Sequence, residues 1–417
     1  MKNSDVVWIG EIPKNWKIKK GKYNFINHKY IPGMQSEQYD RLALTLNGVI
    51  YRSKDDADGL QPKDFMTYQL LQKDELVFKL IDLQNVSTSR VGLSPYTGLV
   101  SPAYIILSAN GEVLPEFAEK FFLMLWYTQI FNALGDDGIR SNLSTRDLLN
   151  IPICYPEKNH QLKIAQFLDE KCAKINGLMD DLDKEVKTLA EYKKSIIAET
   201  VTHGLNSNAE LVISKLGWID KIPQHWRIEK FRYKLKARRV SGYGDKQVLS
   251  VYRELGVIPK DSRDDNHNVT SEDTSKYKYV RPNDFVINKM KAWQGSMGVS
   301  EYEGIVSPAY FVYEFLDDSY NPRYFHYFMR NANNIPEYRR LSGGIREGQW
   351  DLSPYDLGNM PIVVPPKTEQ NEIVNYLDEK CKLIEESITE KLQQIEKLKE
   401  YKASLIYEYV TGKKQVI

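Results

Sequence analysis

The second half of this sequence repeats the first half at a spacing of about 209 residues, so the chain consists of two copies of one unit. Matching segments recur in the same order: Trp8–Trp16 with Trp218–Trp226, Val100–Tyr104 with Val306–Tyr310, and Leu168–Cys172 with Leu377–Cys381. Between these segments the copies diverge, as in residues 47–66 against residues 256–275. We interpret the shared parts as scaffold and the divergent parts as two different recognition surfaces.

The composition is typical of a globular protein and gives no sign of a membrane span or a metal site. The 417 residues are enough for two or three domains, and 42% of them are hydrophobic against 27% charged. No apolar run is long enough to cross a membrane, and the N-terminus does not resemble a signal peptide. The three cysteines show no zinc or disulfide spacing, and the six histidines occur singly. We expect a cytoplasmic protein without a bound metal.

The formal net charge of +1 does not by itself indicate a nucleic-acid-binding protein, because such proteins usually carry a clear positive excess. The distribution of charge matters more than its sum, since acidic residues elsewhere can offset a basic surface. Basic clusters occur at residues 14–22 and 227–239. Both clusters are suited to contacts with a DNA backbone.

Each copy begins with an expected α/β domain of about 150 residues. Short runs of β-forming residues alternate with turns rich in Gly and Pro, and helical patterns follow them. After Pro156 and Pro366 the pattern changes to a long, charge-rich helix. The expected strands cover 75–78, 103–107, 151–154, 309–313 and 361–364, and the expected shorter helices cover 115–134 and 321–331.

Both long helical segments carry a heptad-like apolar stripe. A lone helix with such a stripe would expose it to water, so we expect the two helices to pair as an antiparallel coiled coil with pseudo-twofold symmetry. Pairing between two chains is the alternative. Glu185, Lys391 and Lys402 take polar positions in the stripes, and Tyr192 extends the first. The expected pairing residues are Ile175, Leu178, Leu182, Leu189, Ile196, Ile384, Ile388, Ile395, Leu398 and Leu405.

Motifs for catalysis are not found in the sequence. An adenine methyltransferase would need an Asn/Asp-Pro-Pro-Tyr/Phe motif, and the closest segments are Ser101-Pro-Ala-Tyr104 and Ser307-Pro-Ala-Tyr310. Their serine and alanine favour a turn at a strand edge. No glycine-rich loop has the context of a phosphate or dinucleotide site, and the carboxylate–lysine pairs belong to the long helices.

Two segments in each copy are candidates for contacts with DNA. One is a loop that follows an expected strand, and the other is a glycine-arginine turn near the end of the domain. Lysine suits phosphates, glutamine suits adenine edges and arginine suits guanine. The alternatives are that Trp293 is buried and that the arginines bind carboxylates of their own domain. The candidate residues are Lys79, Gln84, Arg90, Arg140, Asn142, Lys289, Lys291, Trp293, Gln294, Arg346 and Gln349.

The repeated motifs resemble the specificity subunits of Type I restriction–modification systems over essentially the whole chain. The resemblance is carried by Trp-x-x-x-Ile-Pro-x-x-Trp at Trp8 and Trp218, and by Gly-x-Val-Ser-Pro-Ala-Tyr in both copies. Leu-Ser-x-x-Asp-Leu begins at Leu143 and Leu352, and Gln-x-x-Ile begins at Gln161 and Gln370. Each motif is weak alone, but the set is duplicated and in order.

The resemblance implies a non-catalytic subunit that binds double-stranded DNA. It implies target-recognition domains at 1–155 and 207–365, each reading half of a split target, and helical spacers at 156–206 and 366–417 that set the gap. The implied partners are two methyltransferase subunits, which bring S-adenosylmethionine, and restriction/motor subunits, which use ATP and Mg. A self-sufficient methyltransferase or nuclease, and a purely structural rod, are the competing hypotheses. The target bases do not follow from the sequence.

Overall fold

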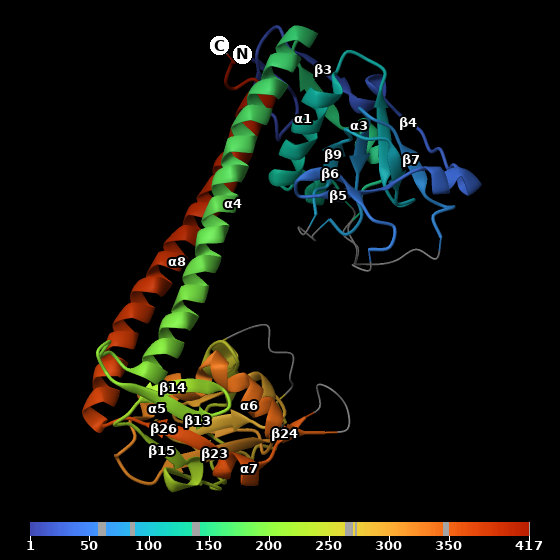
Figure 1. The fold of residues 1–417 in the computed structure, drawn as a ribbon. Helices are drawn as coiled ribbons and strands as arrows, with labels where there is room; N and C mark the ends of the chain where they lie inside the picture. Colours follow the sequence, from blue (N-terminus) through green and yellow to red (C-terminus); the bar gives the residue numbers. More distant parts are fainter. Residues whose placement is uncertain are drawn as a thin grey trace. The chain divides into compact units, whose positions relative to one another are not determined.

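The computed structural model describes residues 1–56, 64–83, 88–135, 142–262, 270–271, 273–344 and 350–416 (Figure 1). The chain divides into two compact units. Unit 1 comprises residues 1–183 and 392–417, and unit 2 comprises residues 184–391. The two long helices, α4 (Lys158–His203) and α8 (Lys367–Val410), each contribute one part to unit 1 and the other part to unit 2.

Both units consist of short strands and short helices that follow one another in the same order. The remaining elements of unit 1 are β1 (Lys2–Asn3), β2 (Glu11–Ile12), β3 (Lys17–Lys20), β4 (Phe25–Asn27), β5 (Arg41–Thr45), β6 (Gly48–Arg52), β7 (Gln69–Leu71), β8 (Leu76–Phe78), β9 (Val91–Leu93), β10 (Gly98–Val100), β11 (Ile105–Ala109), α1 (Pro115–Tyr127), α2 (Ile130–Leu134), α3 (Thr145–Asn150) and β12 (Pro152–Tyr155). Those of unit 2 are β13 (Leu211–Leu216), β14 (Ile219–Pro223), β15 (Arg227–Lys230), β16 (Leu235–Ala237), β17 (Leu249–Tyr252), β18 (Gly256–Pro259), β19 (Lys278–Val280), β20 (Phe285–Asn288), β21 (Met297–Val299), β22 (Gly304–Val306), β23 (Tyr310–Phe315), α5 (Pro322–Arg330), α6 (Ile335–Arg340), β24 (Ser342–Gly343), β25 (Asp351–Leu352), α7 (Pro354–Asn359) and β26 (Pro361–Val364).

Unit 1 is layered, with two four-stranded sheets and a helix. The sheets have the orders β6-β5-β10-β7 and β4-β11-β8-β9. Successive side chains of a strand point to opposite faces, so Val77 of β8 lies in the small core that also contains residues of the first sheet. Its neighbours Leu76 and Phe78 lie in the large core with Phe121 of α1. The β4-β11-β8-β9 sheet is therefore buried on both faces.

Unit 2 repeats this arrangement. Its four-stranded sheet has the order β16-β23-β20-β21, and the pairs β17-β18 and β19-β22 are joined by a parallel bridge between Val248 and Ile305. Val286 of β20 lies in the small core, whereas Phe285 and Ile287 lie in the large one. The expected mixed α/β fold with two repeated, sheet-containing units and two long helices is confirmed.

The expected elements differ from the observed ones mainly at their ends. Strand β11 begins at Ile105 because a turn, closed by the hydrogen bond from Tyr104 N to Ser101 O at 3.1 Å, occupies the preceding residues. The helix expected at 115–134 is divided into α1 and α2 because Gln129 has a left-handed backbone with φ of 60°. Such a conformation cannot continue an α-helix.

The apolar stripe of α4 is displaced by one residue from the expected one at two positions. Leu178 is 56% exposed, so its prediction as a pairing residue is wrong, and Met179 packs against the core of unit 1 instead. Tyr192 is 53% exposed, and the neighbouring Lys193 pairs with Glu385. The steps from Ile175 to Met179 and from Met179 to residue 182 keep the four–three alternation of a heptad.

Within each unit the parts of α4 and α8 meet through apolar and polar side chains. Ile175 and Leu405 are buried in the core of unit 1, and Ile196 and Ile384 are buried in unit 2. Leu182, Leu189, Ile388, Ile395 and Leu398 are half-buried. The polar positions are also paired: Lys391 binds Glu185, and Lys402 Nζ donates to Asn176 Oδ1 at 2.9 Å.

The repeated Gln-x-x-Ile motif has the same structural role in both units. The amide of Gln161, which is fully buried, donates to the carbonyls of Glu112 and Pro156, and its oxygen accepts from Leu114 N. Gln370 makes the equivalent contacts with Ser319 O, Pro365 O and Asn321 N. The motif therefore fastens the start of each long helix to the domain that precedes it.

Candidate nucleic-acid interface

In each unit the structure joins the loop after the expected strand to residues that directly follow the glycine-arginine turn; residues 136–141 and 345–349 of the turns lie outside the described residues. We define the β8 loop as residues 79–90, of which 84–87 lie outside the described residues, and the β20 loop as residues 288–296. Leu352 N donates to Lys289 O at 3.2 Å, and Leu143 N donates to Leu80 O at 3.0 Å. Each loop is therefore joined to the segment that ends its own domain.

The β20 loop is a tight turn held by its own backbone. Lys291 N donates to Asn288 O at 3.0 Å, and Lys291 O accepts from Gln294 N at 3.1 Å and from Ser296 N at 3.2 Å. Gly295 has a φ of +85°, which favours glycine. These contacts fix the direction of the side chains at the tip, where Met290 and Lys291 are exposed.

The base of the β20 loop is held by side chains. Trp293 packs edge-to-face against Trp350 at a centroid distance of 5.4 Å, and the Arg339 guanidinium lies over its ring at 5.8 Å. Lys289 Nζ forms an ion pair with Asp351 Oδ2 at 3.0 Å. Trp293 and Lys289 thus have roles within the fold, Gln294 is half-buried, and Lys291 is the exposed candidate.

The β8 loop is held by a buried arginine. Arg90 is 0% exposed, and its Nη2 donates to Asp82 O at 2.5 Å. Burial lowers the pKa of this guanidinium. The prediction that Arg90 contacts DNA is therefore wrong, because the side chain is inside the domain and holds the backbone of the loop.

The other candidate DNA-contact residues of unit 1 that the structure describes are less buried than Arg90. Lys79 is half-buried and donates from Nζ to Thr88 Oγ1 at 3.1 Å, and burial lowers its pKa. Asn142 is exposed and forms a β-bridge with Ile81. Gln84, Arg140, Arg346 and Gln349 lie outside the described residues.

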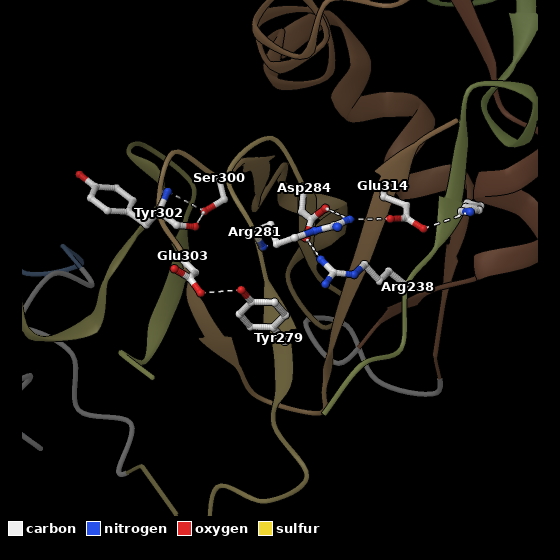
Figure 2. Close-up of polar contacts among 9 residues, drawn as sticks. Arg238, Tyr279, Arg281, Asp284, Ser300, Tyr302, Glu303 and Glu314 are labelled. Atoms are coloured by element: carbon white, nitrogen blue, oxygen red, sulfur yellow. Dashed lines mark hydrogen bonds and ion pairs between the residues drawn. The ribbon is translucent and has the colours of Figure 1, made fainter. Parts of the chain in front are cut away.

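Strand β20 is anchored at its other end by a network of charges, shown in Figure 2. Asp284 Oδ2 accepts from Arg238 Nη1 at 2.6 Å and from Arg281 N at 2.7 Å, and Arg281 Nη2 reaches Glu314 at 2.6 Å. Burial raises the pKa of Asp284. The residues that directly precede β20 are therefore held in place by this network, at the end of the strand opposite the candidate loop.

The equivalent position in unit 1 is Glu75, which starts β8. Its carboxylate accepts from Gln72 N at 2.8 Å and from Ser108 Oγ at 2.6 Å, and it lies 3.2 Å from His28 Nε2. Ser108 Oγ also lies 3.0 Å from His28 Nδ1, so the three side chains contact one another. The Asp284 network holds the residues before β20 in the same way, with different side chains.

An aromatic and basic surface beside this network was not found in the sequence. Tyr243 stacks on Tyr279 at a centroid distance of 4.1 Å. The guanidinium of Arg238 lies over the Tyr279 ring, 5.1 Å from its centroid. Tyr279 donates to Glu303 (Figure 2). Glu303 also pairs with Lys246 at 3.1 Å. The residues that meet here are at least 24 positions apart, so local sequence patterns could not indicate this surface.

The Ser-Pro-Ala-Tyr segments form turns. In unit 1 the Gln69 amide donates to Ser101 O at 2.8 Å and to Tyr104 O at 2.6 Å. In unit 2 the ammonium of Lys278 takes the same place and donates to Pro308 O at 2.9 Å and to Tyr310 O. The carbonyls of each segment therefore accept hydrogen bonds that stabilise the turn. This agrees with the interpretation of the segments as turns at a strand edge.

Among the residues that the structure describes, no group of three or more His, Cys, Asp or Glu side chains is placed to hold a metal ion. In the same part of the chain, no helix combines the length and the apolar character that crossing a membrane requires.

Residues 243–397 match the family model described as the Type I restriction modification DNA specificity domain. A solved structure described as the structural basis underlying complex assembly and conformational transition of the type I R-M system has a TM-score of 0.69, with 14% identity over 96% of this chain and 98% of the other. The HsdS subunit from Thermoanaerobacter tengcongensis has a TM-score of 0.50, with 16% identity and the same coverage. No curated protein matches the chain. Residues 243–397, most of which belong to unit 2, are thus similar to a DNA specificity domain, and the likeness to the solved structures supports the same fold for the whole chain.

Proposed function

We infer that this chain is the DNA-specificity subunit of a Type I restriction–modification system. The observation that carries the inference is the match of residues 243–397 to the DNA specificity domain. Most of these residues belong to unit 2, and unit 1 repeats its sheets, its cores and its buried glutamine. A protein that recognises two different half-sites requires two specificity domains that share one fold but differ in their loops.

Each unit would read one half of a split DNA target through the tips of its β8 or β20 loop. Exposed polar side chains on a rigid loop can bind base edges in the major groove, whereas basic residues around it bind phosphates. The basic clusters at residues 14–22 and 227–239 would bind phosphates away from the loop tips, since Arg238 pairs with Asp284 at the opposite end of β20. Helices α4 and α8 would set the gap between the half-sites.

Chemistry would be supplied by partners of this chain. The proposed partners are two methyltransferase subunits, which hold S-adenosylmethionine, and restriction/motor subunits, which use ATP and Mg. The specificity chain itself is proposed to be non-catalytic, and its DNA-binding role agrees with the family match to a specificity domain.

The test is co-expression of the full chain with its methyltransferase partner in a host free of adenine methylation, followed by single-molecule mapping of N6-methyladenine. We expect one split motif with a fixed gap. Controls that express the partner alone or the chain alone should give no methylation. A soluble complex that methylates no motif would contradict the proposal, and methylation by the chain alone would establish an enzyme instead.

A further inference from the structure

The tips of the β8 and β20 loops are equivalent positions of the repeat that carry opposite charges. Ile81 and Asp82 stand in unit 1 where Met290 and Lys291 stand in unit 2. The equivalence is visible in the backbone, because the residues just before these pairs accept the same hydrogen bond, Leu80 O from Leu143 N and Lys289 O from Leu352 N.

All four tip side chains are available to a ligand. Ile81 is 41% exposed and Met290 is 51% exposed, and the two charged residues are classed as exposed as well. Within the described part of the chain, neither the Asp82 carboxylate nor the Lys291 ammonium makes a hydrogen bond or an ion pair. Their neighbours Lys79, Arg90 and Lys289, by contrast, are all engaged within the fold.

Both tips are held rigidly, but by different means. The Lys291 backbone is fixed through Asn288, Gln294 and Ser296, and Trp293 below it is packed against Trp350. Asp82 has a φ of 54°, and its carbonyl accepts from the buried Arg90. The backbone of such preorganised turns loses little conformational entropy on binding, which favours specific contacts.

The acidic tip of unit 1 is compatible with DNA because cations lie close to it. The Asp82 carboxylate favours the charged forms of Lys79 and Arg90 and so partly offsets the lowering of their pKa values by burial. The β8 loop therefore carries more positive than negative charge around its tip, and the phosphates of a duplex are not repelled by a lone carboxylate.

We propose that Asp82 and Lys291 are base-reading residues of the two half-sites, with Asp82 accepting a hydrogen bond from the amino group of a cytosine and Lys291 donating to the O6 and N7 atoms of a guanine. Carboxylates accept from cytosine N4, and lysine donates to guanine in the major groove. Ile81 and Met290 are placed to contact thymine methyl groups. The proposal rests on the function proposed above and names the residues through which the two units differ.

The experiment compares Asp82→Ala and Lys291→Ala with the wild-type chain, each co-expressed with the methyltransferase partner. The readouts are the genome-wide N6-methyladenine motif and the methylation rates of purified complexes on duplexes that differ from the target at one base pair. We expect Lys291→Ala to lose about tenfold discrimination at one guanine of one half-site. Asp82→Ala should lose discrimination at one cytosine of the other half-site.

Two further variants separate reading from general effects. Lys291→Arg keeps a donor and should preserve the guanine, whereas Lys221→Ala removes another exposed lysine of unit 2, on strand β14, and should leave the motif unchanged. Thermal unfolding of the Lys291 variants should match the wild type, because that side chain makes no contact that stabilises the fold. Asp82→Ala should unfold at a slightly lower temperature, because the φ of 54° at this position disfavours alanine.

The outcomes are distinguishable from failure of the proposed function. If the wild-type complex methylates no split motif, the proposed function is wrong before any variant is compared. If the wild-type motif is split and both alanine variants reproduce it with unchanged discrimination, or both relax the same half-site, the assignment of Asp82 and Lys291 is overturned while the function stands.

Discussion

Two glycines at equivalent positions of the repeat follow the long helices and lie against tryptophans. Gly412 has a φ of +72°, and a Cβ there would lie 2.5 Å from Pro13 Cδ and 3.1 Å from Trp16 Cζ2. Gly204 has a φ of +76°, and its Cβ would lie 3.1 Å from Trp226 Cζ2. The paired Trp-x-x-x-Ile-Pro-x-x-Trp motifs thus supply the surface on which each helix ends.

We predict that Gly412→Ala lowers the free energy of unfolding by about 2–3 kcal/mol, since a left-handed backbone and a clash with proline act together. Gly204→Ala should cost less, about 1–2 kcal/mol, because its closest contact is longer. Urea unfolding of the full chain measures both. Gly177→Ala is the matched control: this site within α4 has nothing within 4 Å of the added Cβ, and alanine there should stabilise by about 1 kcal/mol. Equal stability of all three variants would contradict the account.

His326 makes the stability of unit 2 depend on pH. Burial and the nearby Arg330 and Arg323 lower its pKa to about 3, and its Nδ1 accepts a hydrogen bond from Val299 N at 3.2 Å. An unfolded histidine takes up a proton near pH 6.5, whereas the folded one does not until about pH 3. Its contribution to stability is therefore complete above pH 6.5 and is lost progressively as the pH falls towards 3.

The expected result is that His326→Asn reduces the loss of unfolding free energy between pH 7 and pH 5, because asparagine does not titrate. Denaturant unfolding at both pH values measures the difference. His160→Asn, in unit 1, is the control and should keep the wild-type dependence. A variant at residue 326 with an unchanged pH dependence would show that the histidine is protonated in the folded state.

Candidate contact residues were the least predictable feature at this scale. The sequence drew attention to the loops, since charged residues followed an expected strand in both copies. It could not distinguish Arg90, which is buried and binds the backbone, from Lys291, which is exposed, because burial depends on the packing of distant segments. Arg339 and Trp350, which hold Trp293, belong to other segments of the chain and showed no local pattern.

At the scale of elements, periodicity placed both long helices and the five strands that it predicted, which correspond to β8, β11, β12, β23 and β26. Strand β26 has the expected bounds, and the alternation of Leu76, Val77 and Phe78 between two cores explains why β8 is apolar throughout. The heptad phase of α4 was harder, because adjacent apolar residues compete for one position. Leu178 and Met179 are both apolar, and only the packing selects Met179.

This choice gives a prediction for the helix pair. Met179→Ala should lower the free energy of unfolding by about 1–2 kcal/mol, because it removes packing at a half-buried position. Leu178→Ala should change it by less than about 0.5 kcal/mol, because its side chain is exposed. Thermal or urea unfolding of the two variants measures the difference. A larger effect at residue 178 would contradict the observed phase of the stripe.

At the scale of the whole molecule, the internal repeat was the most reliable evidence. Four kinds of repeated feature have equivalent roles in both units: the tryptophans that meet the helix ends, the turns that precede β11 and β23, the buried glutamines, and the long-helix lysines Lys193 and Lys402. What the repeat shares is therefore scaffold. The loops at the tips differ, as recognition of two half-sites requires.

The central claim, that each unit reads one half of a split target, is tested most directly by a chimera in which residues 227–364 also replace residues 17–155. Both segments begin at equivalent strands, β3 and β15, and end at β12 and β26, which pair with them. The measurement is the N6-methyladenine map of the chimera with its methyltransferase partner. We predict a split motif in which one half-site of the wild-type motif occurs twice and the other is lost. A motif that keeps both original half-sites would show that the units do not read them separately.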